Sequence, residues 1–182
     1  MLCVIAKLNN DATEKLESLR KAALPPDLVV KPLYGHITVA AYTGDEETSF
    51  IQLCKEQMSN CPAFHIEYSR IEVLEETSIL VALPGESETL AALHEVIAEN
   101  CHDTLDKWTR IGCWYPHTTL LYAPHLDLHA LCCEMRKVFV PFAADICRFE
   151  FSRVLEDGFE IVDSVDLPFL INQAWWSESE EL

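Results

Sequence analysis

Two short stretches of the sequence repeat a spacing of tyrosine, histidine and threonine that could carry out acid–base chemistry. Two histidines that titrate near neutrality can act as base and acid in one reaction, and threonine hydroxyls can donate hydrogen bonds to an anionic centre. A phosphodiester suits this set, because its hydrolysis or transesterification needs one proton removed, one delivered and negative charge stabilised. The residues are Tyr34, His36 and Thr38 in YGHITVAAY (34–42), and Tyr115, His117 and Thr119 in YPHTTLLY (115–122).

Each motif is predicted to begin a β-strand at its histidine. The runs HITVAAY (36–42) and HTTLLYA (117–123) are short and apolar, and each follows a loop that contains proline. Side chains two residues apart on a strand point to the same face, so each histidine shares a face with the threonine that follows it. If the two faces meet, the cleft between them holds two imidazoles and two hydroxyls.

The rest of the sequence alternates between patterns typical of strands and of helices. Asp11 and Glu14 have the spacing of a capping box at the start of the first helix, and Asp157-Gly158 is typical of a hairpin turn. We therefore expect strands at 2–8, 63–75 and 78–84 and two more within 144–169, helices at 9–24, 48–60, 86–105 and 128–138, and loops at 25–35 and 106–116.

An internal repeat is predicted from two matches at similar separations. The histidines, at 36 and 117, are 81 residues apart, and EYSRI and EFSRV, which start at 67 and 150, are 83 residues apart. Each half then reads as strand, helix, loop, histidine-bearing strand, helix and long strand. This order predicts an α+β fold of two lobes related by a pseudo-twofold axis, each an antiparallel sheet with helices on its outer face, with a central cleft.

Composition limits the partners and the setting of the protein. The 182 residues carry 30 acidic and 13 basic side chains, a formal charge of −17, which would repel long nucleic acid. The eight cysteines include no C-x-x-C pair, the N-terminus lacks the features of a signal peptide, and no stretch approaches the roughly 20 apolar residues of a membrane span. We expect a cytoplasmic monomer without membrane contact, with one bilobal domain at 1–176 and an acidic tail at 177–182.

The sequences GHITVAAY and PHTTLLY resemble the paired His-x-Thr-hydrophobic motifs of the 2H phosphoesterase superfamily, in its 2′-5′ RNA ligase-like branch, which includes RNA 2′,3′-cyclic phosphodiesterases. The resemblance extends over most of the chain, to the closing stretch at 141–169. It implies a LigT-like fold and an enzyme that opens a 2′,3′-cyclic phosphate, on an RNA end or a small nucleotide, without a metal or other cofactor. By microscopic reversibility such a site could also perform 2′-5′ RNA ligation.

The resemblance also implies roles for the motif residues. His36 and His117 would be the catalytic base and acid, in an order that the sequence leaves open, and Thr38 and Thr119 would hold the phosphoryl oxygens. The chain departs from the family at SRIEV (69–73), where many relatives are glycine-rich. Arg70, and Arg153 by the repeat, could add positive charge beside the cleft, although a surface arginine is more often paired with a carboxylate.

Further residues beside the motifs are candidates for substrate binding. Aromatic and cationic side chains in the preceding loops could hold a base and its phosphate, although a tyrosine entering a strand or an aromatic in a loop is often only packing. The candidates are Tyr34, Tyr115, Lys31, Arg110 and Trp114.

Two other functions are consistent with parts of the sequence. A non-catalytic module that binds nucleotides or RNA ends would keep the same cleft without turnover. A metal-dependent hydrolase would use His125 and His129, which are four residues apart, but Pro124 predicts that His125 precedes the helix and no further ligand motif completes the set. No metal site is therefore expected, and His94 and Cys132 are predicted to be core residues.

Overall fold

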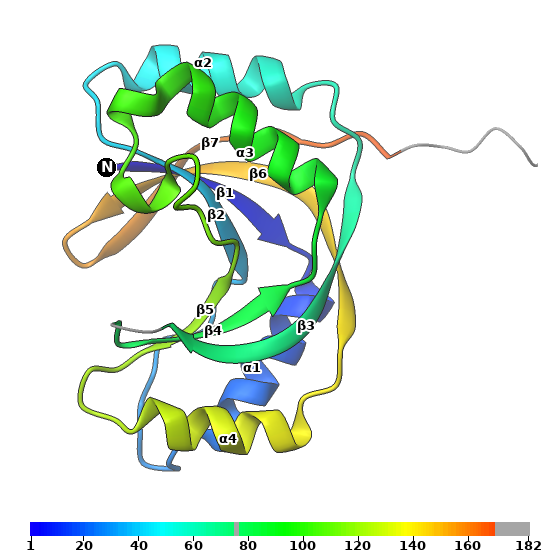
Figure 1. Ribbon diagram of the computed structural model, residues 1–182, viewed down its shortest axis with the longest axis vertical. Helices are drawn as coiled ribbons and strands as arrows, with labels where there is room; N and C mark the ends of the chain where they lie inside the picture. The colour runs from blue at the N-terminus through cyan, green and yellow to red at the C-terminus, as the bar shows by residue number, and fades with distance from the viewer. Residues whose placement is uncertain (75–76, 170–182) are drawn as a thin grey trace, which may run out of the picture.

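All seven β-strands join one antiparallel sheet in the computed structural model, which describes residues 1–74 and 77–169 (Figure 1). The strands are β1 (Leu2–Leu8), β2 (His36–Tyr42), β3 (Phe64–Leu74), β4 (Ile79–Pro84), β5 (Thr118–Tyr122), β6 (Phe142–Leu155) and β7 (Gly158–Asp166). The α-helices are α1 (Asn10–Ala23), α2 (Glu47–Met58), α3 (Glu88–Cys101) and α4 (Leu128–Val138), and two 3-10 helices, η1 (His102–Thr104) and η2 (Lys107–Thr109), follow α3.

The strand order divides this sheet into two lobes. The order is β2-β1-β6-β3-β4-β5, with β7 also paired to β6. Strand β6 pairs with β3 through residues 142–146 and with β1 through residues 146–153. In Figure 1, β1, β2 and β7 lie with the far part of β6 in the upper lobe, and β3, β4 and β5 form the lower lobe. The predicted α+β fold with two lobes is therefore confirmed.

The pairing of the strands follows the same pattern in the two lobes. The register shifts between Val4 and Ile5 where β1 meets β2, and between Leu80 and Val81 where β4 meets β5. It shifts again where β1 meets β6, at Lys7/Leu8, and where β3 meets β4, at Tyr68/Arg70. Since irregularities of this kind are local features of a strand pair, their recurrence at matching positions identifies β2, β1 and β6 with β5, β4 and β3.

The predicted equivalence of EYSRI and EFSRV is wrong. Lys7 on β1 lies opposite Arg148 on β6, and Leu83, at the matching place on β4, lies opposite Arg70 on β3. The counterpart of Arg70 is therefore Arg148, five residues before Arg153. Arg153 instead pairs with Glu47 of α2 and Glu160 of β7. The resemblance between the two pentapeptides does not follow the hydrogen-bonded register, which determines the positions that are equivalent in space.

Each lobe is covered by two helices. Helices α2 and α3 pack together on the upper lobe, and α1 and α4 pack together on the lower lobe (Figure 1). The core between helices and sheet contains large apolar side chains such as Leu16, Tyr68 and Phe149, all fully buried. Burial of these side chains is the main force that holds the helices on the sheet.

The first helix begins earlier than the capping-box spacing predicts. The side chain of Asn9 accepts a hydrogen bond from the backbone N–H of Ala12, so Asn9 is the N-cap. Asp11 lies inside the helix and pairs with Lys15. The expected strands and helices otherwise occur close to their predicted bounds, and His117 lies immediately before β5.

Part of the predicted domain organisation lies outside the described residues. The acidic tail at 177–182, and the end of the predicted domain after residue 169, fall in that part of the chain. Among the residues that the structure describes, no helix is both long and apolar enough to cross a lipid bilayer.

Gly35, which precedes the first motif histidine, lies against Thr13 of α1. A Cβ at this position would overlap Oγ1 of Thr13, so we expect Gly35→Ala to lower the free energy of unfolding by about 1–3 kcal/mol. Urea denaturation should show that the loss is smaller in a Thr13→Ala background, where the hydroxyl and methyl are removed. An equal loss in both backgrounds would contradict this steric explanation.

Candidate active site

The two motif histidines are held by identical backbone contacts. Nδ1 of His36 lies 2.6 Å from the carbonyl oxygen of Tyr34, and Nδ1 of His117 lies 2.7 Å from that of Tyr115. A carbonyl oxygen can only accept a hydrogen bond, so Nδ1 carries the proton in both rings. In the neutral state Nε2 is therefore the basic atom of each imidazole, as a group that takes a proton from a substrate requires.

A buried hydroxyl joins the two motifs across the lobes. Thr118, between the second histidine and its threonine, donates a hydrogen bond of 2.8 Å from Oγ1 to the carbonyl oxygen of His36. Oγ1 of Thr118 also lies 2.5 Å from the hydroxyl of Tyr68, and because the Thr118 proton is used on the His36 carbonyl, the Tyr68 hydroxyl donates to Oγ1. The indole N–H of Trp114 also donates to the carbonyl oxygen of Thr38, at 2.9 Å. These bonds bring the two predicted motifs together.

The two motif threonines lie beside the histidines on the same strand faces. Thr38 is half-buried opposite Ile5 of β1, and Thr119 is exposed opposite Val81 of β4. Within residues 1–74 and 77–169, no protein group is hydrogen-bonded to either side-chain hydroxyl. Each hydroxyl is thus free to donate to a bound anion.

Burial makes both imidazoles weaker bases than a histidine in water. It lowers the pKa of His36 and that of His117, and the hydrogen bond from each Nδ1 to a carbonyl partly offsets the effect. At His36 the positive charges of Lys7 and His117 lower the pKa further, while Glu150 raises it. Both rings are thus favoured in the neutral form near pH 7, and their environments differ.

The sequence analysis did not identify the cluster beside His36. Lys7, directly opposite His36 on β1, donates to the carbonyl oxygen of Gly35 at 3.1 Å, and its Nζ lies 4.0 Å from the centre of the Tyr34 ring. The Tyr34 hydroxyl donates to the buried carboxylate of Glu150 at 2.6 Å. Burial and this bond raise the pKa of Tyr34. Only the alternation of strand side chains could have indicated that Lys7 faces the cleft.

The surroundings of His117 are more open. Tyr115 is 41% exposed, and its hydroxyl lies 3.3 Å from Nη2 of Arg70 and 3.4 Å from Oε2 of Glu72. Arg70 and Glu72 also form an ion pair of 2.8 Å. The aromatic ring and the cation that the sequence placed near this motif are therefore adjacent, with a carboxylate beside them.

The other candidate binding residues make contacts within the protein. Lys31 donates to the carbonyl oxygen of Asp157 at 3.2 Å, and Arg110 donates to that of Leu105 at 3.0 Å. Trp114 stacks on the buried ring of His94, with ring centres 4.1 Å apart. Arg110 and Trp114 thus hold the loop that covers the free edge of β2, and a role in substrate binding stays a prediction for all three candidates.

The histidines considered for a metal site do not share a helix face. His125 lies in the turn before α4, and His129 lies in the first turn of that helix. In the described part of the chain, no group of three or more histidine, cysteine, aspartate or glutamate side chains is arranged to hold a metal ion. His94 and Cys132 are buried, as predicted for core residues.

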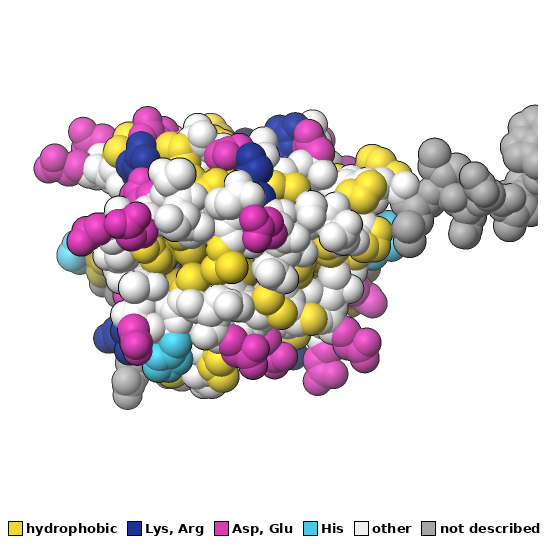
Figure 2. All heavy atoms as spheres, turned by 90° about the horizontal axis from the view of Figure 1, so that it is seen from above, with side chains coloured by type: hydrophobic (Ala, Val, Ile, Leu, Met, Phe, Trp, Pro, Cys, Tyr) yellow, Lys and Arg dark blue, Asp and Glu magenta, His cyan; other side chains and the backbone are white. Residues whose placement is uncertain are grey.

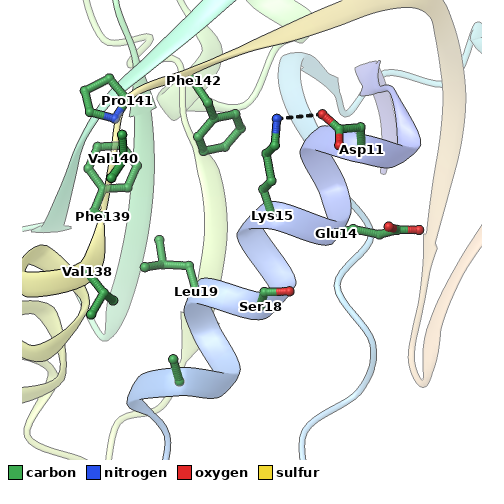
Figure 3. A pocket seen from close by; sticks show the side chains of 11 residues that line it. Asp11, Glu14, Lys15, Ser18, Leu19, Val138, Phe139, Val140, Pro141 and Phe142 are labelled. Carbon is green, nitrogen blue, oxygen red and sulfur yellow. Dashed lines mark ion pairs between the residues drawn. The ribbon is translucent and has the colours of Figure 1, made fainter.

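Three cavities lie outside the motifs, and one of them, of about 630 Å³, lies between α2 and Asp163 of β7. A groove of about 640 Å³ separates α1 from the junction of α4 and β6, where Leu19 faces Phe139 and Phe142 (Figure 3). A smaller apolar pocket of about 360 Å³ lies between the start of α3 and Trp114 and Pro116. None of the three cavities is lined by a motif histidine or threonine.

Comparisons with known proteins agree with this fold. The model of the 2′-5′ RNA ligase superfamily matches residues 9–158. Among solved structures, Escherichia coli LigT in its apo form is similar at 15% identity with a TM-score of 0.65, covering 92% of this chain and 96% of LigT. The protein TT0787 of Thermus thermophilus is similar at 15% identity and a TM-score of 0.64, covering 93% and 98%. No curated protein matches the sequence.

The bridging role of Thr118 can be tested against its neighbour. Thr118→Val keeps the shape but leaves the buried Tyr68 hydroxyl and the His36 carbonyl without this partner, so it should lower the free energy of unfolding by about 1–3 kcal/mol. Thr119→Val, at an exposed position, should change it by less than about 0.5 kcal/mol. Chemical denaturation of both variants measures the difference, and equal effects would refute the bridge.

The lowered histidine pKa values predict how stability depends on pH. His36, His94 and His117 bind protons less readily in the folded state than in the unfolded state, where the pKa is about 6.5. The unfolded chain therefore binds more protons below about pH 7, and the free energy of unfolding contributed by these groups should fall as the pH drops from about 7. Urea denaturation across this range tests the sign, and a gain in stability on mild acidification would contradict it.

Proposed function

Because the chain belongs to the 2′-5′ RNA ligase superfamily, whose model matches residues 9–158, we propose that it is a metal-independent cyclic phosphodiesterase. The proposed substrates are 2′,3′-cyclic phosphates at RNA ends or on small nucleotides. The observation that carries the proposal is the pair of imidazoles, His36 and His117, each with Nδ1 bound to a backbone carbonyl and Nε2 as its basic atom. The Thr118 bridge holds the two motifs together.

The proposed reaction uses one histidine as base and the other as acid. One Nε2 takes a proton from water as the water oxygen attacks phosphorus, and the other Nε2 delivers a proton to the ribose oxygen that leaves. The hydroxyls of Thr38 and Thr119 donate to the phosphoryl oxygens, where negative charge increases in the transition state. In the reverse direction the same groups could join RNA ends through a 2′-5′ bond.

The charge distribution supports a small substrate rather than long nucleic acid. The protein carries a formal charge of −17, and Figure 2 shows many acidic side chains and a few basic ones around a hydrophobic band on the face seen from above. Cations do lie near the motifs, at Lys7, Arg70 and Arg148. LigT, which has a similar fold, has been solved with 3′-AMP. A nucleotide or an RNA end would meet these local cations without crossing the acidic surface.

A second candidate is a module that binds the same ligands without turnover. It is favoured by the pairing of the cleft arginines with carboxylates, Arg70 with Glu72 and Arg148 with Asp166, which leaves less free positive charge for a transition state. Such a module would release its ligand unchanged. Action as a cytoplasmic monomer, expected from the sequence, stays part of either proposal.

The proposal predicts that both histidines are needed for turnover. With 2′,3′-cyclic nucleotides and a short RNA that ends in a cyclic phosphate, His36→Ala and His117→Ala should each lower kcat by roughly 10²–10⁴-fold, and excess EDTA should not affect the unmodified protein. The exposed His125 is a matched control, and His125→Ala should keep full activity.

Product analysis separates the candidates. A single 2′- or 3′-phosphate product identifies the bond that breaks and supports the enzyme. Tight binding of the cyclic nucleotide with no product would favour the binding module, and full activity of both His36→Ala and His117→Ala would exclude a two-histidine reaction.

A further inference from the structure

Resting on the proposed two-histidine reaction, we propose that Lys7 is a positioning residue that makes the two histidines chemically unequal. Through its charge, His36 becomes the base and His117 the acid when a cyclic phosphate is opened. Both rings use the same nitrogen and the same kind of backbone contact, and burial lowers the pKa of each. Lys7 itself belongs to neither motif.

The strand register shows that this charge has no counterpart in the other lobe. On β1, Ile5 lies opposite Thr38 and Lys7 lies opposite His36. On β4, Val81 lies opposite Thr119, so the residue that corresponds to Lys7 is Leu83, two positions further along and 1% exposed. One imidazole therefore has an ammonium group on the neighbouring strand, and the other has a leucine.

Lys7 is fixed near His36 by two contacts that both involve the first motif. Its Nζ donates to the carbonyl oxygen of Gly35 at 3.1 Å and lies 4.0 Å from the centre of the Tyr34 ring. These are the two residues before His36. A cation held in a half-buried position is screened less by water than one on the surface, so its effect on the neighbouring imidazole persists.

Other charges around His36 do not cancel this effect. Glu150 of β6 opposes it, but its carboxylate accepts the hydrogen bond from Tyr34, and its influence on the His36 pKa is smaller than that of Lys7. Arg148 of β6, opposite Lys7, is exposed and paired with Asp166 of β7. From the second motif, His117 disfavours protonation of His36 as well.

Near His117 the charged side chains compensate one another. Arg70 and Glu72 form an ion pair, and Tyr115 lies beside both. The first proton taken up by the pair of imidazoles therefore goes to His117.

This order of protonation assigns the steps of the reaction. Nε2 of His36 takes a proton from water while the water oxygen forms its bond to phosphorus. The bond from phosphorus to one ribose oxygen breaks, and that oxygen receives the proton of His117 Nε2. The products are a phosphate monoester and a hydroxyl group. His36 is then protonated beside Lys7, which favours loss of its proton to solvent, and His117 takes up a proton from solvent, which together restore the starting state.

The test is the proton titration of each histidine followed by NMR of its Cε1–H group, assigned with His36→Gln and His117→Gln. Lys7→Gln removes the charge but keeps a donor for Gly35, and should raise the proton affinity of His36 by at least roughly threefold, with a smaller change at His117. Lys7→Arg keeps the charge and should restore the original midpoint. Lys15→Gln, on α1 beside Asp11 (Figure 3), is the matched control and should change neither histidine.

The activity profile gives a second readout. In Lys7→Gln, His36 should become protonated at a higher pH and so stop acting as a base at a higher pH. The acidic limb of the curve of activity against pH should therefore move to higher pH. An unchanged His36 midpoint, or an equal shift at His117, would overturn the role of Lys7. Absence of turnover in the unmodified protein would instead reject the proposed function, and the titration would still decide whether Lys7 sets the order of protonation.

Discussion

The pairing of β6 with both β1 and β3 is the constraint on which the rest of the structure depends. Residues 142–146 of β6 pair with β3, and residues 146–153 pair with β1. Both lobes therefore belong to one sheet. Strand β2, which begins at His36, and strand β5, which begins just after His117, then lie at opposite ends of the strand order. They can meet only because the sheet curves around the cleft, and the Thr118 hydroxyl on the His36 carbonyl marks the place where they do.

Strand β2 lies at an edge of the sheet, where its free backbone groups need hydrogen-bond partners. The loop that leads into the second motif supplies them. The backbone N–H of Ala41 bonds to the Thr109 hydroxyl, and the carbonyl oxygen of Ala41 accepts from the N–H of Asp106. Trp114 adds the bond to Thr38. The loop that leads into the second motif therefore also holds the strand of the first motif, which couples the position of His36 to that of His117.

Much of this arrangement could be predicted from local patterns. Strand β2 occupies the predicted residues 36–42, because a proline-containing loop and a β-branched apolar run specify it locally. Features that depend on register could not be predicted. The match between EYSRI and EFSRV indicated that Arg70 and Arg153 are equivalent, whereas the register makes Arg148 the counterpart of Arg70. Lys7 and Glu150 are far from either motif in sequence, so only strand pairing brings them to His36.

The similarity of the two lobes raises a question for a reaction that needs one base and one acid. The two motifs hold both imidazoles by the same nitrogen, each on the carbonyl oxygen of its own tyrosine, and this contact alone does not make one ring the base and the other the acid. Acid–base catalysis in one step needs one protonated and one neutral group. A change at one of two equivalent positions resolves this without altering the backbone. Lysine at position 7, opposite leucine at 83, places a charge beside one imidazole only, and the shared strand geometry keeps both rings in place to react.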